Sequence, residues 1–188
     1  MKEQSKVNMN RRDNDKKDPV QTNGIVKISA EEIMREPKVN QCIEMLASTD
    51  NRRIILGCGE LLRVSDLNLL ILSQNANDEK QKEVYSKIRT QVYAILDNLL
   101  SEMKSDDFKN IALTERDAFM KVVTFLRERN AQAILLEIAL ESDNPDIANS
   151  ATYHFIKNGE RDALLVISHN AVCTSARNIA SRELQMIN

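Results

Sequence analysis

The chain has 188 residues with a formal net charge of −2, and 42% of its residues are hydrophobic although only 4% are aromatic. This length is enough to bury one good core and corresponds to one or two domains. Four glycines and three prolines are too few for the turns of a sandwich or barrel of many short strands. We therefore predict an all-α protein whose core consists mainly of Leu, Ile, Val, Ala and Met.

The charge is unevenly distributed along the chain. Residues 1–24 carry six basic and four acidic side chains, so this segment is near +2 and the remainder is near −4. A body with a net negative charge has no long-range attraction to DNA or to an anionic membrane. We expect another protein as the partner, and we keep nucleic acid, engaged through the N-terminal segment, as an alternative.

No segment has the pattern of a membrane anchor or of a secretory signal. The N-terminus is polar, and the apolar run over residues 69–72 is far too short to span a bilayer. The three cysteines, Cys42, Cys58 and Cys173, are odd in number and widely spaced in apolar helical contexts. This pattern favours reduced, buried thiols over a disulfide framework, and we expect a soluble, cytoplasmic protein without membrane insertion.

The N-terminal region separates into an arm and the start of a folded domain. Residues 1–24 contain almost no apolar side chains, so they cannot bury enough surface to offset the entropy of ordering. We predict a disordered arm over residues 1–24 and a single all-helical domain over residues 25–188. Within it, residues 25–28 could form an extended strap, and residues 29–32 have the spacing of a capping box.

Four further helices are predicted up to residue 104. Pro37 is well placed to open the first, followed by a helix over residues 52–64, a separate one that starts at Ser65–Asp66, and a long amphipathic helix over residues 79–104. The second of these contains Gly57 and Gly59, each of which costs about 1 kcal/mol in a helix interior. These glycines mark either a bend or the close approach of another backbone.

Five shorter helices are expected after a polar connection anchored by Phe108. The first is capped near Thr114 and directs Phe119, Val122, Val123 and Leu126 inward. The other four are predicted over residues 131–141, 145–157, 160–168 and 171–186. Asn144–Pro145 is the clearest helix start and Asn158–Gly159 the clearest stop.

One pattern of residues recurs in the C-terminal half at a spacing of roughly 25 to 30 residues. The first copy comprises Asn144–Ile147, Ala151, Gly159 and Ala163–Leu165, and a weaker second copy comprises Asn170, Val172, Ala176, Arg177 and Ala180. Over about residues 115–187 the chain thus resembles HEAT-like helical repeats of the short type. The resemblance implies stacked antiparallel helix pairs in a multi-helix array, or α-solenoid; an irregular helical bundle is the alternative, and the long helix over residues 79–104 departs from the repeat.

The resemblance implies a binding function, because stacked helix pairs create extended contact surfaces. We therefore predict a non-enzymatic interaction module: an adaptor, scaffold or assembly factor that holds a partner protein by its helix faces. Arg161, Arg177 and Arg182 are the predicted partner-binding residues, because arginine is enriched among the contacts that dominate binding. Homo-oligomer formation stays open.

No catalytic, cofactor or metal constellation is evident in the sequence. We expect His154 to lie partly inside a helix interface and His169 to lie at a helix end; neither has Cys or Asp partners at metal-ligand spacing. The segment Gly57–Glu60 lacks the strand and the GK[ST] ending of a phosphate loop. A second alternative is an enzyme with an unrecognised thiol site that pairs Cys58 or Cys173 with a histidine.

Overall fold

The computed structural model describes residues 37–74 and 79–187, so the predictions for residues 1–24, 25–28 and 29–32 lie outside the described residues. The described part is all-helical and contains no strand, which confirms the predicted fold class. Its elements are α2 (Pro37–Leu46), α3 (Asn51–Gln74), α4 (Glu79–Leu99), the short 3₁₀ helix η1 (Ser105–Phe108), α5 (Arg116–Glu128), α6 (Gln132–Glu141), α7 (Pro145–Asn158), α8 (Arg161–Asn170) and α9 (Thr174–Ile187).

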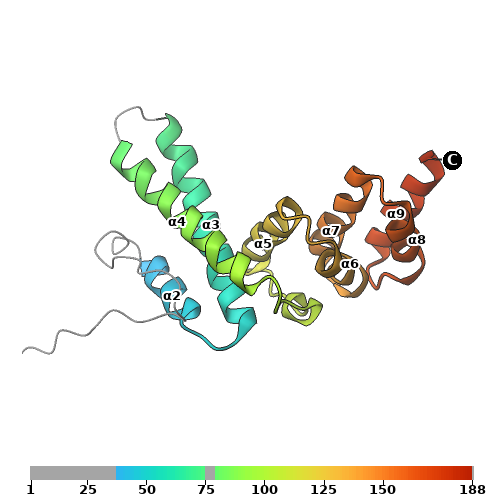
Figure 1. Cartoon of the computed structure of the whole chain (residues 1–188), viewed down its shortest axis with the longest axis horizontal. Coiled ribbons are helices and arrows are strands. Elements are labelled where there is room, and N and C mark those ends of the chain that lie inside the picture. Colours follow the sequence, from blue (N-terminus) through green and yellow to red (C-terminus); the bar gives the residue numbers. More distant parts are fainter. Residues whose placement is uncertain (1–36, 75–78, 188) are drawn as a thin grey trace, which may run out of the picture.

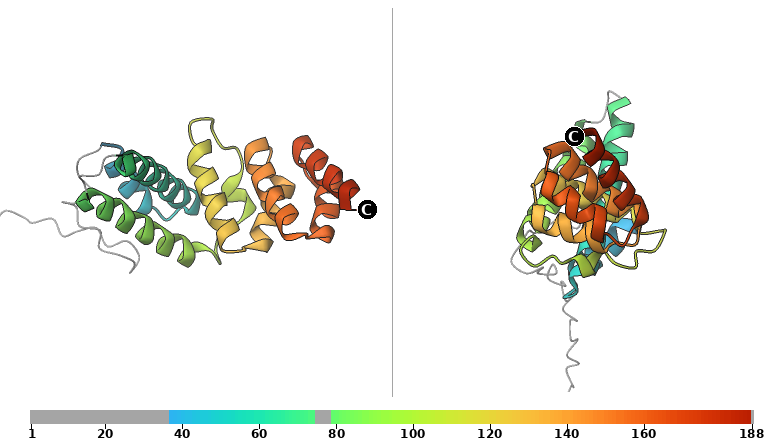
Figure 2. Two further views of the ribbon diagram at one scale, coloured as in Figure 1. Left: turned by 90° about the horizontal axis from the view of Figure 1, so that it is seen from above. Right: turned by 90° about the vertical axis from the view of Figure 1, so that its right-hand side faces the viewer.

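The helices form an elongated array of antiparallel pairs (Figure 1). In one layer, α3 packs on α5, α5 on α7, and α7 on α9. The other layer contains α4, which packs on α3 of the first layer, and α6, which contacts η1 and α8. Seen from above, successive pairs follow one another along the long axis (Figure 2), and α2 covers one side of α3. The buried side chains form one continuous core cluster that extends from Val39 to Ala180.

The helices from α5 onward begin at a constant spacing, which we call the repeat interval. Helices α5, α7 and α9 start at Arg116, Pro145 and Thr174, and α6 and α8 start at Gln132 and Arg161, so each start is separated from its counterpart by the same length of chain. Buried positions follow the same interval. On α5, α7 and α9, the fully buried side chains one repeat interval apart are Ala118, Ile147 and Ala176, and Val122, Ala151 and Ala180. On α6 and α8 they are Leu135 and Leu164, and Ile138 and Ile167.

The ends of α7 follow from local sequence. The side chain of Asn144 accepts hydrogen bonds from the backbone N–H groups of Asp146 and Ile147 at 3.1 and 3.3 Å, and Pro145 follows at the first helical position. Gly159 ends the helix with φ of +67°, a left-handed conformation in which an L side chain is strained. One repeat interval earlier, Asn130 follows α5 in the same conformation, with φ of +53°. The predicted start and stop of α7 are confirmed.

Two predicted helices, over residues 52–64 and from Ser65, are one continuous helix, α3. The predicted helix start at Ser65–Asp66 is wrong, because both residues take part in the packing of α3 against other helices. Ser65 is buried in the middle of the helix, and the Asp66 carboxylate accepts a hydrogen bond from Lys121 on α5. The local preference of Ser and Asp for helix starts is overridden by the packing of α3 across both α4 and α5.

Two further predictions need correction. The helix predicted over residues 79–104 ends at Leu99, whose carbonyl accepts the N–H groups of Glu102 and Met103 in a turn that buries Met103. Val172, predicted inside the repeat pattern, is 60% exposed. Its backbone N–H, rather than its side chain, connects the α8–α9 loop to α6 by donating to the Leu140 carbonyl at 2.7 Å.

Gly57 and Gly59 mark close approaches to other helices within an unbroken α3. A Cβ atom added at Gly59 would lie 2.2 Å from the carbonyl oxygen of Ala118 on α5. A Cβ atom added at Gly57 would lie 2.9 Å from the Cβ atom of Met45 on α2. Of the two predicted explanations, close backbone approach is therefore confirmed.

We predict that Gly59→Ala lowers the free energy of unfolding by about 3 kcal/mol, because the new methyl group meets a backbone carbonyl that cannot move aside. Gly57→Ala should be milder, because its methyl group would lie 2.9 Å from the Met45 Cβ atom and 3.1 Å from the Cys42 carbonyl oxygen, farther than the contact at Gly59, and because it gains helix propensity. Urea unfolding followed by circular dichroism measures both. Equal stability of Gly59→Ala and the unaltered protein would show that α3 and α5 do not approach this closely.

Candidate functional site

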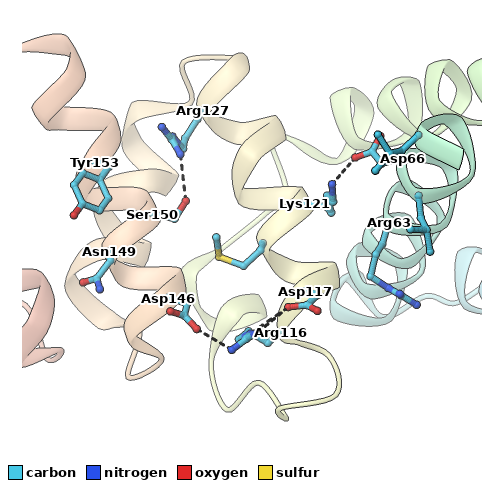
Figure 3. Close-up of a pocket in the computed structure, with 13 residues that line it drawn as sticks. Arg63, Asp66, Arg116, Asp117, Lys121, Arg127, Asp146, Asn149, Ser150 and Tyr153 are labelled. Atoms are coloured by element: carbon cyan, nitrogen blue, oxygen red, sulfur yellow. Dashed lines mark hydrogen bonds and ion pairs between the residues drawn. The ribbon is translucent and has the colours of Figure 1, made fainter. Parts of the chain in front are cut away.

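A broad depression lies across the exposed flanks of α3, α5 and α7. It has a volume of about 900 Å³, and we call it the α3–α5–α7 groove (Figure 3). Its lining combines apolar and charged side chains: Arg63, Asp66, Leu67 and Leu70 from α3; Arg116, Asp117, Met120, Lys121 and Arg127 from α5; and Asp146, Asn149, Ser150 and Tyr153 from α7.

Helical spacing explains why these residues share one face. On α5 the buried side chains Phe119, Val122 and Leu126 face the core, and the lining positions fall on the opposite side of the helix. The same relation holds on α7, where Ile147 and Ala151 are buried while Tyr153 is exposed. The groove is therefore the outer surface of the layer that contains α3, α5 and α7.

Large apolar side chains in the groove are left accessible to solvent. Leu67 is 52% exposed, Leu70 is 59% exposed and Tyr153 is 49% exposed, although their helices bury other faces completely. Met120 adds a partly buried thioether packed against the core. Single exposed apolar residues are common, but a group of them in a depression rimmed by charge is typical of an interaction surface.

The charged residues are arranged as ion pairs that cross from helix to helix. Lys121 on α5 binds the Asp66 carboxylate on α3, and Arg116 lies 3.2 Å from Asp146 on α7 (Figure 3). Arg116 also contacts Asp117 at 3.1 Å. Exposed pairs of this kind contribute only about 0–1 kcal/mol each. These pairs connect α3 to α5 and α5 to α7 along the charged rim of the groove.

The predicted partner-binding arginines lie outside the lining of this groove. Arg177 holds the α8–α9 loop: its guanidinium donates to the Ala171 carbonyl at 2.6 Å and to the Thr174 hydroxyl at 3.0 Å. Arg161 is exposed at the start of α8. Arg182 is exposed on α9, one repeat interval after Tyr153, so it occupies the position on α9 that corresponds to Tyr153 on α7.

The sequence pattern does not single out the groove residues themselves. Leu67 and Leu70 belong to a stretch that is apolar on nearly every side, which is typical of a central helix, yet both side chains are exposed. Met120 and Tyr153 were not distinguished from the neighbouring core residues. The signal that could have located them is the register set by the repeat interval, because it separates buried positions on α5 and α7 from outward-facing ones.

His154 is buried in the layer and is 4% exposed, as expected. Its Nε2 atom lies 3.0 Å from the side-chain nitrogen of Asn158, which can only donate, so the ring is neutral and Nε2 accepts. Burial, together with the positive charges of Arg127 and Lys157, lowers the pKa of His154, while Glu160 opposes this effect. The environment therefore favours a neutral structural histidine. His169 lies in the last turn of α8, as predicted, and its Nδ1 atom is 2.8 Å from the Leu165 carbonyl.

The lowered pKa of His154 predicts a loss of stability in mild acid. The unfolded chain binds the proton near the ordinary pKa of about 6.5 and the folded chain binds it only below that value, so stability falls as the pH drops through this range. The limiting slope is about 1.4 kcal/mol per pH unit. Urea unfolding between neutral and mildly acidic pH should show a loss of stability with a slope up to this limit, and His154→Gln should reduce the slope. His169→Gln is the control, and an unchanged slope in His154→Gln would contradict the assignment.

The three thiols are free and buried, as predicted. Burial raises the pKa of Cys42 to about 11, with a further increase from the charge of Glu60. Burial also raises the pKa of Cys58, and Cys42 adds to this effect. A thiol with a raised pKa is a poor nucleophile at neutral pH. Neither residue has the positively charged, accessible surroundings of a reactive cysteine.

We predict that Cys42 reacts roughly 100-fold more slowly with iodoacetamide in the folded protein than in the unfolded chain, because a pKa raised by two units lowers the thiolate fraction by that factor. Cys58 should be slower still. Mass spectrometry of protein labelled at mildly alkaline pH, with and without guanidinium, measures each site. Rapid labelling of Cys58 in the folded protein would restore the thiol-enzyme alternative.

The described part of the chain contains no cluster of three or more His, Cys, Asp or Glu side chains placed to hold a metal ion. Among its helices, none combines the length and the apolar composition needed to cross a membrane. Comparisons with protein-family models, with curated proteins and with solved structures gave no match.

Proposed function

We propose that this chain is a non-enzymatic, HEAT-like protein-binding module that holds a partner through the α3–α5–α7 groove. The observation that carries the proposal is the set of half-exposed apolar side chains, Leu67, Leu70 and Tyr153, inside a depression whose rim is charged. Stable protein interfaces have this arrangement, with an apolar centre that loses its water and a polar rim that remains accessible.

The architecture supports a scaffold or adaptor role. Helix pairs that recur at a constant interval give a rigid, extended surface, and each pair contacts mainly its neighbours. The ion pairs between α3 and α5 and between α5 and α7 hold the groove walls before a partner arrives. Preorganisation of this kind reduces the entropy lost on binding. The reduced thiols are compatible with a cytoplasmic location.

A pair of matched substitutions tests the proposal. Leu67→Asp places a charge in the groove, whereas Leu165→Asp makes the same change on α8 at a leucine that is 50% exposed. Both variants should fold, because neither side chain is in the core. We predict that Leu67→Asp lowers the capture of native partners from a lysate by about tenfold or more, while Leu165→Asp leaves it unchanged.

Quantitative mass spectrometry of the captured proteins, with thermal melting as the folding control, provides the measurement. Complexes held by the apolar centre should also persist in high salt, which strips contacts to phosphate backbones. Equal capture by the two variants would reject the groove as the binding surface. Complexes that contain nucleic acid and dissociate in high salt would support the nucleic-acid alternative.

A further inference from the structure

One cation in the groove differs from the others in its contacts. Arg116 and Lys121 are neutralised by Asp146 and Asp66, whereas Arg127 donates only to the neutral Ser150 hydroxyl, at 3.4 Å. Within the described residues, no carboxylate lies at ion-pair distance from the Arg127 guanidinium. Figure 3 shows Arg127 at the opposite end of the groove from Arg116, near Ser150.

The nearby acids are engaged elsewhere. Glu128 accepts a hydrogen bond from the Tyr93 hydroxyl of α4 at 2.8 Å, and Glu160 accepts one from Gln132 at 2.8 Å. Lys157 and the buried His154 line a second, smaller depression that shares Arg127 with the groove. The other cation of the lining, Arg63, forms an ion pair with Glu60, so within the described residues Arg127 is the lining cation without a carboxylate partner.

The length and chemistry of the groove indicate what it can hold. Arg116 and Arg127 are eleven residues apart on α5, which corresponds to about 16 Å along the helix axis. This is about three turns of a second helix. The described helices offer no strand edge for β-augmentation. The apolar centre and the three aspartates are poorly suited to a phosphate backbone.

We propose that the groove takes an amphipathic helical segment of a partner protein, with its apolar side chains against Leu67, Met120 and Tyr153 and a carboxylate of that segment paired with Arg127. This inference rests on the proposed function and specifies its partner. The apolar contacts supply affinity, and the carboxylate sets the direction and the register of the helix. An arginine guanidinium is suited to this pairing because it donates two parallel hydrogen bonds to a carboxylate.

Three stapled helical peptides of about three turns provide the probe. They share leucines at helical spacing on one face and carry Glu, Gln or Lys at the position that should reach Arg127. In fluorescence anisotropy with the full chain, we expect the Glu peptide to bind about tenfold more tightly than the Gln peptide, and the Lys peptide to bind most weakly. Equal affinities for all three peptides would overturn the carboxylate pairing.

Two arginine variants make the test specific. Arg127→Gln should remove the preference for the Glu peptide, and Arg127→Glu should shift it toward the Lys peptide. Arg53→Gln is the matched control, because Arg53 is exposed on α3 and does not line the groove. Circular dichroism melting checks that each variant folds. A preference for Glu that survives Arg127→Gln, or is lost in Arg53→Gln, would refute the assignment.

The outcomes separate this inference from the proposed function. If all three peptides bind equally and Leu67→Asp abolishes their binding, the groove is a protein-binding surface and the inferred carboxylate is wrong. If no peptide binds at millimolar concentration, the helical partner is rejected. The capture of partners by Leu67→Asp and Leu165→Asp then tests the proposed function independently of this inference. A concentration-dependent dimer in sedimentation that Leu67→Asp disrupts would instead assign the groove to a second copy and overturn the inference.

Discussion

The contact of α3 with α5 at Gly59 determines how the rest of the array can be built. The backbone of Ala118 lies so close to Gly59 that there is no room for a methyl group. This contact places the long α3–α4 hairpin directly beside the first of the regularly spaced helices. It also sets the separation of two groove walls, because Asp66 and Leu67 follow Gly59 on α3 by about two turns while Lys121 follows Ala118 by about one. The ion pair between Lys121 and Asp66 then crosses this separation.

Small buried residues continue the same principle along the layer. Ala118, Ala151 and Ala176 have no exposed surface and lie on α5, α7 and α9, the helices that pack on one another in this layer. Only short side chains allow helices to approach closely along much of their length, so these alanines keep the layer regular. The larger buried residues fill the space between the two layers: Phe119 and Phe125 of α5 stack edge-on against Phe108 of η1 and Tyr93 of α4.

Periodicity was sufficient to predict the helical class and the inward faces, because burial follows helical spacing closely. The inward residues Phe119 and Val122 and the capping residues Asn144 and Gly159 behave as predicted. The continuity of α3 could not be predicted, since Ser65–Asp66 has the composition of a helix start and only tertiary contacts with α5 decide otherwise. The groove was missed for a related reason: exposure of Leu67 depends on where α3 extends past its neighbours, which local sequence does not encode.

Comparison of the repeated helices within the chain shows why the groove lies on only part of the layer. Inward positions stay apolar from α5 to α7 to α9, as in Val122, Ala151 and Ala180, because each of them is fully buried. Outward positions change in character: Asp117 corresponds to Asp146 and then to Ser175, and Thr124 to Tyr153 and then to Arg182. The acids that neutralise the groove cations therefore stop at α7, and the aromatic side chain is replaced by a cation on α9. A repeated scaffold thus supplies uniform packing, while its outward residues confine the apolar, charge-rimmed surface to α3, α5 and α7.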